Sequence, residues 1–198
     1  MRAEGADADY AWHGDASLSG ADAVVLPGGF AHGDYLRTGA IARFSPVMEA
    51  VGELARSGAP VLGICNGFQI LAEAGLVPGA LRRNEGLRFL CTWTELEVVD
   101  TDTIATRACT KGQRLHIPIN HYEGNYTPAE GSAPRIAFRY VENPNGAWQN
   151  AAGVANDAGN VVGMMPHPER ASESWLGSSD GRHVIASLVE SCRVATRA

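Results

Sequence analysis

Apolar residues along the chain gather in short runs that are typical of buried strands, and stretches with helical spacing separate them. The strand-like runs are residues 23–29, 60–65, 89–99, 114–119, 135–141, 151–157 and 160–166, with a weaker one at 9–12. Apolar spacing predicts helices over residues 45–56, from Cys65 to about Gly75, and over 182–193. The order strand, helix, strand over residues 23–65 indicates a parallel unit in this half of the chain.

The second half has the character of antiparallel strands, and the segment "NDAGN" at 156–160 predicts a hairpin between two of them. A parallel α/β half followed by hairpins favours a three-layer α/β fold with ligands at the carboxyl ends of the strands. A length of 198 residues is enough for one such domain, so a single domain over 1–198 is expected.

Composition and charge exclude some partners and indicate the cellular compartment. The net charge is -6, and the longest basic feature is the doublet Arg82-Arg83, which reads as a solvated loop, so nucleic acid and anionic membranes are poor partners. The four cysteines are scattered without a C-x-x-C pair, which favours thiols in a reducing compartment. No apolar run approaches the roughly 18 residues of a membrane span. We therefore expect a soluble, cytoplasmic protein.

One cysteine lies where a strand-like run gives way to a helix, in the segment Gly63-Ile64-Cys65-Asn66-Gly67. The form G-x-C-x-G at such a junction predicts a nucleophile elbow with sulfur in place of serine oxygen. In this turn the chain approaches so closely that side chains two residues before and after the nucleophile would clash. Helix N-terminal amides beside the sulfur would favour the thiolate. The alternative is a small buried thiol at a tight turn.

A thiolate nucleophile needs a base, and His167 in "MMPHPER" is the best of the six histidines. Prolines on both sides favour extended backbone, so His167 and Glu169 can project to the same side. Glu169 could then orient the imidazole while its other nitrogen faces sulfur, the logic of a catalytic triad. A surface loop is the alternative for a His-x-Glu pair.

An oxyanion hole needs two backbone donors near the attacked carbon. The backbone N–H of Asn66, the residue after the cysteine, is the first expected donor. Gly28 and Gly29 end the strand-like run at 23–29, and Gly29 can supply the second donor because glycines allow the main chain to approach a ligand. An ordinary turn is the alternative reading of this "PGGF" segment.

The chain order Cys, His, Glu, with an early nucleophile, resembles the class I glutamine amidotransferases. The resembling segments are "DAVVLPGGFAHGDYLRTGAIA", "PVLGICNGFQILAEAGLVPGAL", "AFRYVENPNG" and "NVVGMMPHPERA". The run "GGF..GDYLR.GAIA" is similar to the branch of the family that serves purine biosynthesis. The resemblance implies a doubly wound, mostly parallel sheet with antiparallel hairpin additions.

The resemblance also implies the chemistry. Cys65 would attack the side-chain amide of glutamine to form a thioester, and His167 would protonate the departing ammonia and then activate water. Gln69 and His121 would help to hold glutamine, together with Gly28 and Gly29, although Gln69 could equally be a helix-surface amide. Ammonia would pass to a large synthetase subunit that carries ATP and Mg, with a small accessory subunit in the complex. No cofactor is expected in this chain.

Two departures from the family pattern qualify this reading. Where family members have a glycine and a basic residue, this chain has Tyr122 and Asn125, so the contacts of that loop with glutamine or a partner are open. A metal site at His116, His121 and Glu123 is a minor alternative. The first strand and helix of the family are absent ahead of the segment "ADADYAWHGD" at 6–15, and we expect the natural start about 25 to 30 residues upstream.

Two other functions remain open at this point. The chain could be a glutaminase for another synthetase, in nucleotide, folate or tryptophan synthesis. It could also be a non-enzymatic relative of the same fold, which would tolerate the loss of Cys65.

Overall fold

A mixed sheet of seven strands runs through the molecule in the order β1-β2-β9-β8-β7-β4-β5. The computed structural model describes residues 1–30 and 39–195. The strands of this sheet are β1 (Val24–Leu26), β2 (Val61–Ile64), β4 (Leu90–Val98), β5 (Arg114–His121), β7 (Arg135–Tyr140), β8 (Ala151–Ala155) and β9 (Val161–Met164). Each coincides with a strand-like run of the sequence.

Only one side of the sheet is parallel. Strands β1, β2 and β9 run parallel to one another, whereas β9–β8, β8–β7, β7–β4 and β4–β5 are antiparallel pairs. The expectation of a mostly parallel sheet was therefore wrong, because the strands after α2 return through hairpins and loops rather than through crossover helices. β1 lies at the edge of the sheet, and among the described strands it pairs with β2 alone.

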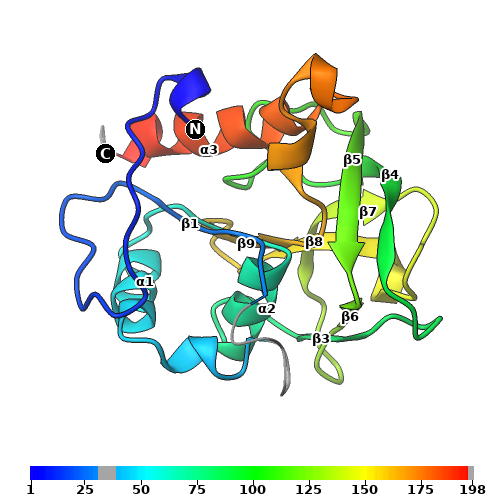
Figure 1. Ribbon diagram of the computed structural model, residues 1–198, viewed down its shortest axis with the longest axis horizontal. Helices are drawn as coiled ribbons and strands as arrows, with labels where there is room; N and C mark the ends of the chain where they lie inside the picture. The colour runs from blue at the N-terminus through cyan, green and yellow to red at the C-terminus, as the bar shows by residue number, and fades with distance from the viewer. Residues whose placement is uncertain (31–38, 196–198) are drawn as a thin grey trace.

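Three helices cover the two faces of the parallel part, which gives the expected three layers. α1 (Val47–Arg56) and α2 (Asn66–Glu73) lie on one side of β1, β2 and β9, and α3 (Gly181–Ala195) lies on the other (Figure 1). Short 3-10 helices are η1 (Arg2–Glu4), η3 (Ala42–Phe44), η4 (Trp148–Asn150), η5 (Pro168–Ala171) and η6 (Ser174–Leu176). None of the described helices is long and apolar enough to cross a membrane.

A second, two-stranded sheet was not predicted. β3 (Ala80–Arg83) pairs antiparallel with β6 (Glu123–Thr127), and the register shifts between Arg82 and Arg83. Both strands are short and mostly polar, so their pattern resembles a loop. The doublet Arg82-Arg83 is exposed as expected, but it lies in a strand.

The weak strand predicted at residues 9–12 is absent. These residues are irregular, and the side chains of Tyr10 and Trp12 are 104% and 69% exposed. Aromatic residues favour strands only when a neighbouring strand or a core covers them, and here neither does. By contrast, the hairpin at 156–160 is confirmed: Asn156 N donates to Val161 O at 3.0 Å, and Gly159 takes a positive φ of 75°.

Candidate active site

The carboxyl ends of the three parallel strands meet at one edge of the sheet. Leu26 of β1 is in register with Gly63 of β2, and Ile64 of β2 is in register with Met164 of β9. The segments that follow these strands carry Gly28, Cys65 and His167. The topology therefore brings the three predicted parts of the site to the same place, as parallel α/β sheets do with their ligands.

Cys65 forms the turn between β2 and α2 in a backbone conformation that is rare for a residue with a side chain. Its φ is 48° and its ψ is -103°, and it is the N-cap residue of α2. Its N–H donates to Met164 O at 2.7 Å, and its carbonyl accepts a bond from Gln69 N at 3.1 Å. Such strain costs on the order of 1 to 3 kcal/mol and persists only where surrounding contacts impose it.

The two flanking glycines are required by close backbone approach, as the sequence predicted. A methyl group at Gly63 would lie 2.7 Å from the carbonyl carbon of Gly67, and one at Gly67 would lie 2.0 Å from Leu26 O. Contacts this short with backbone atoms cannot be relieved by a side-chain rotation. Gly63 therefore packs on Gly67 at the start of α2, and Gly67 packs on Leu26 of β1. These contacts fix the backbone of the turn and thereby the direction of the sulfur.

Gly67→Ala is expected to destabilise the fold by about 3 kcal/mol, because the new methyl group must displace the backbone of β1. Gly86→Ala is the matched control, since a methyl group there meets nothing within 4 Å. Urea unfolding of both variants measures the difference. Equal stability of the two would mean that the tight turn at Cys65 is not imposed by packing.

His167 and Glu169 are joined by a hydrogen bond, the pairing expected from the sequence, but the expected extended backbone is absent because Glu169 lies in the 3-10 helix η5. His167 Nδ1 lies 2.6 Å from Glu169 Oε1, with the imidazole buried and the carboxylate about half exposed. His167 N donates to Pro118 O of β5 at 2.8 Å. A methyl group at Gly181 would lie 2.0 Å from Pro168 O, so the start of α3 packs directly on this segment. β5 and α3 together hold the histidine in place.

Gly28 places the imidazole beside the cysteine. A methyl group on Gly28 would lie 2.6 Å from His167 Cε1 and 3.6 Å from Cys65 Cβ, so both residues border the same glycine. His167 Nε2 is buried and has no hydrogen-bond partner among the described residues. The Cys65 thiol donates to Asn120 O over 3.6 Å. With Nδ1 held by Glu169, Nε2 is the nitrogen available to exchange a proton in this space.

Asn66 and Gln69 form a polar pair on the first turn of α2. Asn66 Nδ2 donates to Gln69 Oε1 at 3.1 Å, and Gln69 Nε2 donates to Glu123 O at 2.6 Å. Gln69 is only 6% exposed, so it is not a helix-surface amide. Asn66 is the first residue of α2, and its backbone N–H belongs to the group that a helix leaves without an intrahelical acceptor.

His121 is a second buried histidine at this site. Its Nδ1 lies 3.1 Å from Asn84 Oδ1, and its Nε2 has no partner in the parts of the chain that the structure covers. Burial, with a smaller contribution from the charge of His167, lowers the pKa of His121 from 6.5 to about 4. The ring is therefore neutral at physiological pH.

This pKa predicts a loss of stability in acid. Between pH 6.5 and 4 the unfolded chain binds a proton at His121 and the folded chain does not, so stability is full above 6.5 and falls as the pH is lowered. From pH 7.5 to 4.5 we expect the free energy of unfolding to fall about 2.5 kcal/mol further in the wild type than in His121→Gln. Urea titrations of both proteins at each pH measure this, and parallel losses would contradict it.

Three further residues named in the sequence analysis, Gly29, Tyr122 and Asn125, make few contacts that would indicate a role. Gly29 is exposed, and a methyl group there would meet nothing within 4 Å. Residues 31–38, which belong to the "GGF..GDYLR.GAIA" run, lie outside the described residues. Tyr122 is partly exposed with the Arg83 guanidinium over its ring, and Asn125 pairs with Arg82 across the two-stranded sheet.

The metal alternative finds no support in the geometry. His116 stacks on Trp93 with ring centroids 4.7 Å apart, and His121 is bound to Asn84. Within residues 1–30 and 39–195, no group of three or more His, Cys, Asp or Glu side chains is placed to hold a metal ion.

Two buried polar residues of this region were not identified from the sequence. Asn84 follows β3 and binds the His121 segment. Tyr140, at the end of β7, is buried, and this burial raises the pKa of its hydroxyl, which stays protonated. Asn84 lies in none of the segments that carry the family resemblance, and Tyr140 lies in "AFRYVENPNG" without any chemistry that this segment suggests, so the tertiary structure was needed to reveal both.

Comparisons with known proteins agree with this geometry. The family model for the CobB/CobQ-like glutamine amidotransferase domain matches residues 6–187. The chain is 55% identical over 201 residues to phosphoribosylformylglycinamidine synthase subunit PurQ of Moorella thermoacetica, covering 94% of this chain and 85% of that protein.

Solved structures give the same picture. A chain in the structure of PurLQS from Thermotoga maritima matches with a TM-score of 0.85 and 43% identity, over 89% of this chain and 82% of that one. A glutamine amidotransferase from the same organism matches with a TM-score of 0.53 and 19% identity, over 91% of this chain and 75% of that one. The second likeness bears on the fold alone.

Proposed function

The chain belongs to the CobB/CobQ-like glutamine amidotransferase family, and on this premise we propose that it is the glutaminase subunit of phosphoribosylformylglycinamidine synthase. It hydrolyses glutamine and delivers ammonia to a synthetase that converts formylglycinamide ribonucleotide to formylglycinamidine ribonucleotide. The observation that carries the glutaminase activity is the convergence of the strained Cys65 elbow with the His167–Glu169 pair around Gly28. The similarity to the PurQ protein supports the choice of pathway.

The reaction begins with attack of the Cys65 sulfur on the side-chain carbonyl carbon of glutamine. His167 Nε2 takes the thiol proton and gives it to the amide nitrogen as the carbon–nitrogen bond breaks, so that ammonia leaves and a glutamyl thioester remains. His167 then takes a proton from water, hydroxide attacks the thioester, and the sulfur leaves with that proton. Glutamate is released and the enzyme is restored.

Backbone donors stabilise the oxyanion of both tetrahedral intermediates. The N–H of Asn66 at the start of α2 is one donor, and the N–H of Gly29 after β1 is the other. Glu169 holds the Nδ1 side of the imidazole and so keeps Nε2 directed to the reacting atoms. Gly28 leaves room for the ring, while Gln69 and His121 shape the glutamine site between α2 and the turn after β5.

Partners follow from the same proposal. The structure of PurLQS from Thermotoga maritima supports a complex with a large synthetase and a small accessory protein. ATP and Mg belong to the synthetase, and this chain needs no cofactor for the thioester chemistry. A cytoplasmic location is proposed with it, because the four cysteines are scattered without a C-x-x-C pair, a pattern that favours thiols in a reducing compartment.

Reconstitution tests the choice of partner. The chain is mixed with formylglycinamide ribonucleotide synthetase and its accessory protein, and glutamine-dependent product formation is compared with that of glutamine-dependent synthetases from nucleotide, folate and tryptophan synthesis. Glutamine-dependent turnover only with the first synthetase is expected. Turnover with another synthetase alone would reassign the pathway, and none with any would favour a non-enzymatic relative.

A further inference from the structure

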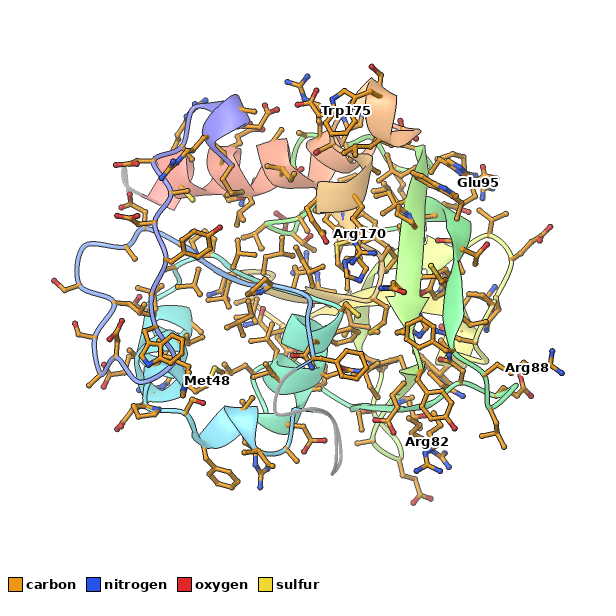
Figure 2. The ribbon with its side chains drawn as sticks, in the orientation of Figure 1. Met48, Arg82, Arg88, Glu95, Arg170 and Trp175 are labelled. Carbon is orange, nitrogen blue, oxygen red and sulfur yellow. The ribbon has the colours of Figure 1, made fainter. Side chains whose placement is uncertain are left out.

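Asn84 is a buried amide in a segment whose neighbours face solvent. It follows β3 directly and is 1% exposed. Figure 2 shows Arg82 and Arg88, on either side of it in the sequence, at the margin of the molecule with their side chains directed outward. A buried amide is costly unless its donors and acceptors are paired, so its partners indicate why it is there.

The partners of Asn84 determine which way its amide points. One side-chain atom faces two backbone carbonyls, Arg88 O at 2.9 Å and His121 O at 3.1 Å. Carbonyl oxygens only accept, so this atom must be the donor Nδ2. The other atom is then Oδ1, which accepts from Gly124 N at 3.1 Å and faces His121 Nδ1 at 3.1 Å.

This orientation fixes the tautomer of His121. An amide oxygen cannot donate, so the proton of the neutral imidazole must lie on Nδ1. Nε2 then carries a lone pair. It is buried and has no donor among the described residues. A buried acceptor without a donor is unfavourable, and a bound ligand with an N–H group would satisfy it.

The strand that ends in His121 borders the candidate active site. In β5, the Asn120 carbonyl accepts the Cys65 thiol, and the Pro118 carbonyl accepts the His167 N–H at 2.8 Å. A methyl group at Gly124 would lie 2.2 Å from His121 Cε1, so the turn after β5 packs against the ring. Asn84 binds both the ring and the Gly124 N–H, and thereby holds the imidazole and the turn as one unit.

We propose that Asn84 is a positioning residue that locks His121 in the Nδ1–H tautomer, so that Nε2 accepts a hydrogen bond from an N–H group of bound glutamine. The inference rests on the proposed function for the identity of the ligand. The tautomer itself depends only on the hydrogen bonds of Asn84.

Two variants and one control test this role. Asn84→Leu keeps the branched shape of the side chain but removes both the Oδ1 acceptor and the Nδ2 donor. Asn84→Asp keeps an acceptor opposite His121 Nδ1 and loses the donor to Arg88 O and His121 O. Asn145→Leu is the control, because Asn145 is equally buried and donates to Gly124 O at 2.8 Å, in the same turn, without bonding the ring.

Nitrogen NMR of the histidine side chains in the full chain reads the tautomer directly. We expect the proton on Nδ1 in the wild type, in Asn84→Asp and in Asn145→Leu, and its partial or complete transfer to Nε2 in Asn84→Leu. A proton on Nε2 in the wild type would overturn the proposal, whether or not Asn84→Leu folds. So would the same transfer in Asn145→Leu, since it would reflect loosening of the turn alone.

Steady-state kinetics of the reconstituted complex test whether the change of tautomer weakens glutamine binding. In Asn84→Leu the KM for glutamine should rise roughly tenfold or more while kcat changes little, since the lost interaction is one of substrate binding. Ammonia-dependent turnover should be unchanged, and Asn84→Asp should recover part of the KM. An unaltered KM beside an altered tautomer would refute the contact with glutamine. Failure of the wild-type complex to use glutamine would instead refute the proposed function.

Discussion

Replacing Cys65 with alanine will reduce glutamine-dependent synthesis by the reconstituted complex by at least about 10^4-fold, because the proposed thioester forms on the Cys65 sulfur. Ammonia-dependent synthesis should persist at the wild-type rate. Cys65 lies in an elbow imposed by backbone contacts, and alanine fits that turn as well as cysteine does. The variant should therefore fold and bind its partners normally. The comparison of the two nitrogen sources separates loss of chemistry from loss of assembly.

Cys91→Ala is the matched control for this variant. Cys91 is an exposed thiol on β4, remote in sequence from the elbow. We expect it to retain full glutamine-dependent turnover. If Cys65→Ala keeps substantial glutamine-dependent turnover, the elbow is a structural turn and the glutaminase assignment fails. If ammonia-dependent turnover is lost as well, the variant has disturbed the complex and the role of the sulfur must be read from Cys65→Ser.

The second large effect is expected from His167→Ala. Removing the imidazole takes away both the base that activates the thiol and the acid that protonates ammonia, so glutamine-dependent turnover should fall about 10^3-fold or more. Glu169→Gln should cost less, because its carboxylate is about half exposed and an amide oxygen can still accept from Nδ1. The measurement is kcat/KM for glutamine in the reconstituted complex.

His116→Ala is the control for this series. His116 stacks on Trp93 and takes no part in the proposed chemistry, so its loss should leave kcat/KM for glutamine within a few-fold. A larger loss in Glu169→Gln than in His167→Ala would contradict the proposed order of roles. Full activity in His167→Ala would assign the base to another residue, and His121 would be the first to examine.

The strands and helices of the main sheet could be predicted because burial imposes a pattern on the sequence. β2, β8 and β9 are covered on both faces, so they read as continuous apolar runs. β3 and β6 escaped prediction because they are short and polar, and their pairing depends on contacts far apart in the chain. The antiparallel character of the second half was predicted and is confirmed, but these strands outnumber the parallel ones, so the sheet as a whole is not mostly parallel as the family resemblance implied.

The candidate site divides in the same way. Cys65 with its glycines, and His167 with Glu169, could be found because each set lies within a few consecutive residues. The extended backbone expected around His167 was wrong, since Glu169 lies in the 3-10 helix η5. Asn84 could not be found like this. Its neighbours Arg82, Arg83 and Glu85 suggest a solvated loop, and its importance arises only when β3 pairs with β6 and turns the amide toward His121.

The most direct test of the account is to trap the covalent intermediate. The reconstituted complex is mixed with glutamine, quenched in acid within one turnover, digested, and analysed by mass spectrometry for a glutamyl group on the peptide that contains Cys65. The account predicts a glutamyl thioester at Cys65 that is absent from Cys65→Ala and accumulates when water attack is slowed. Glutamine turnover without any adduct on Cys65, or with the adduct on another residue, would contradict it.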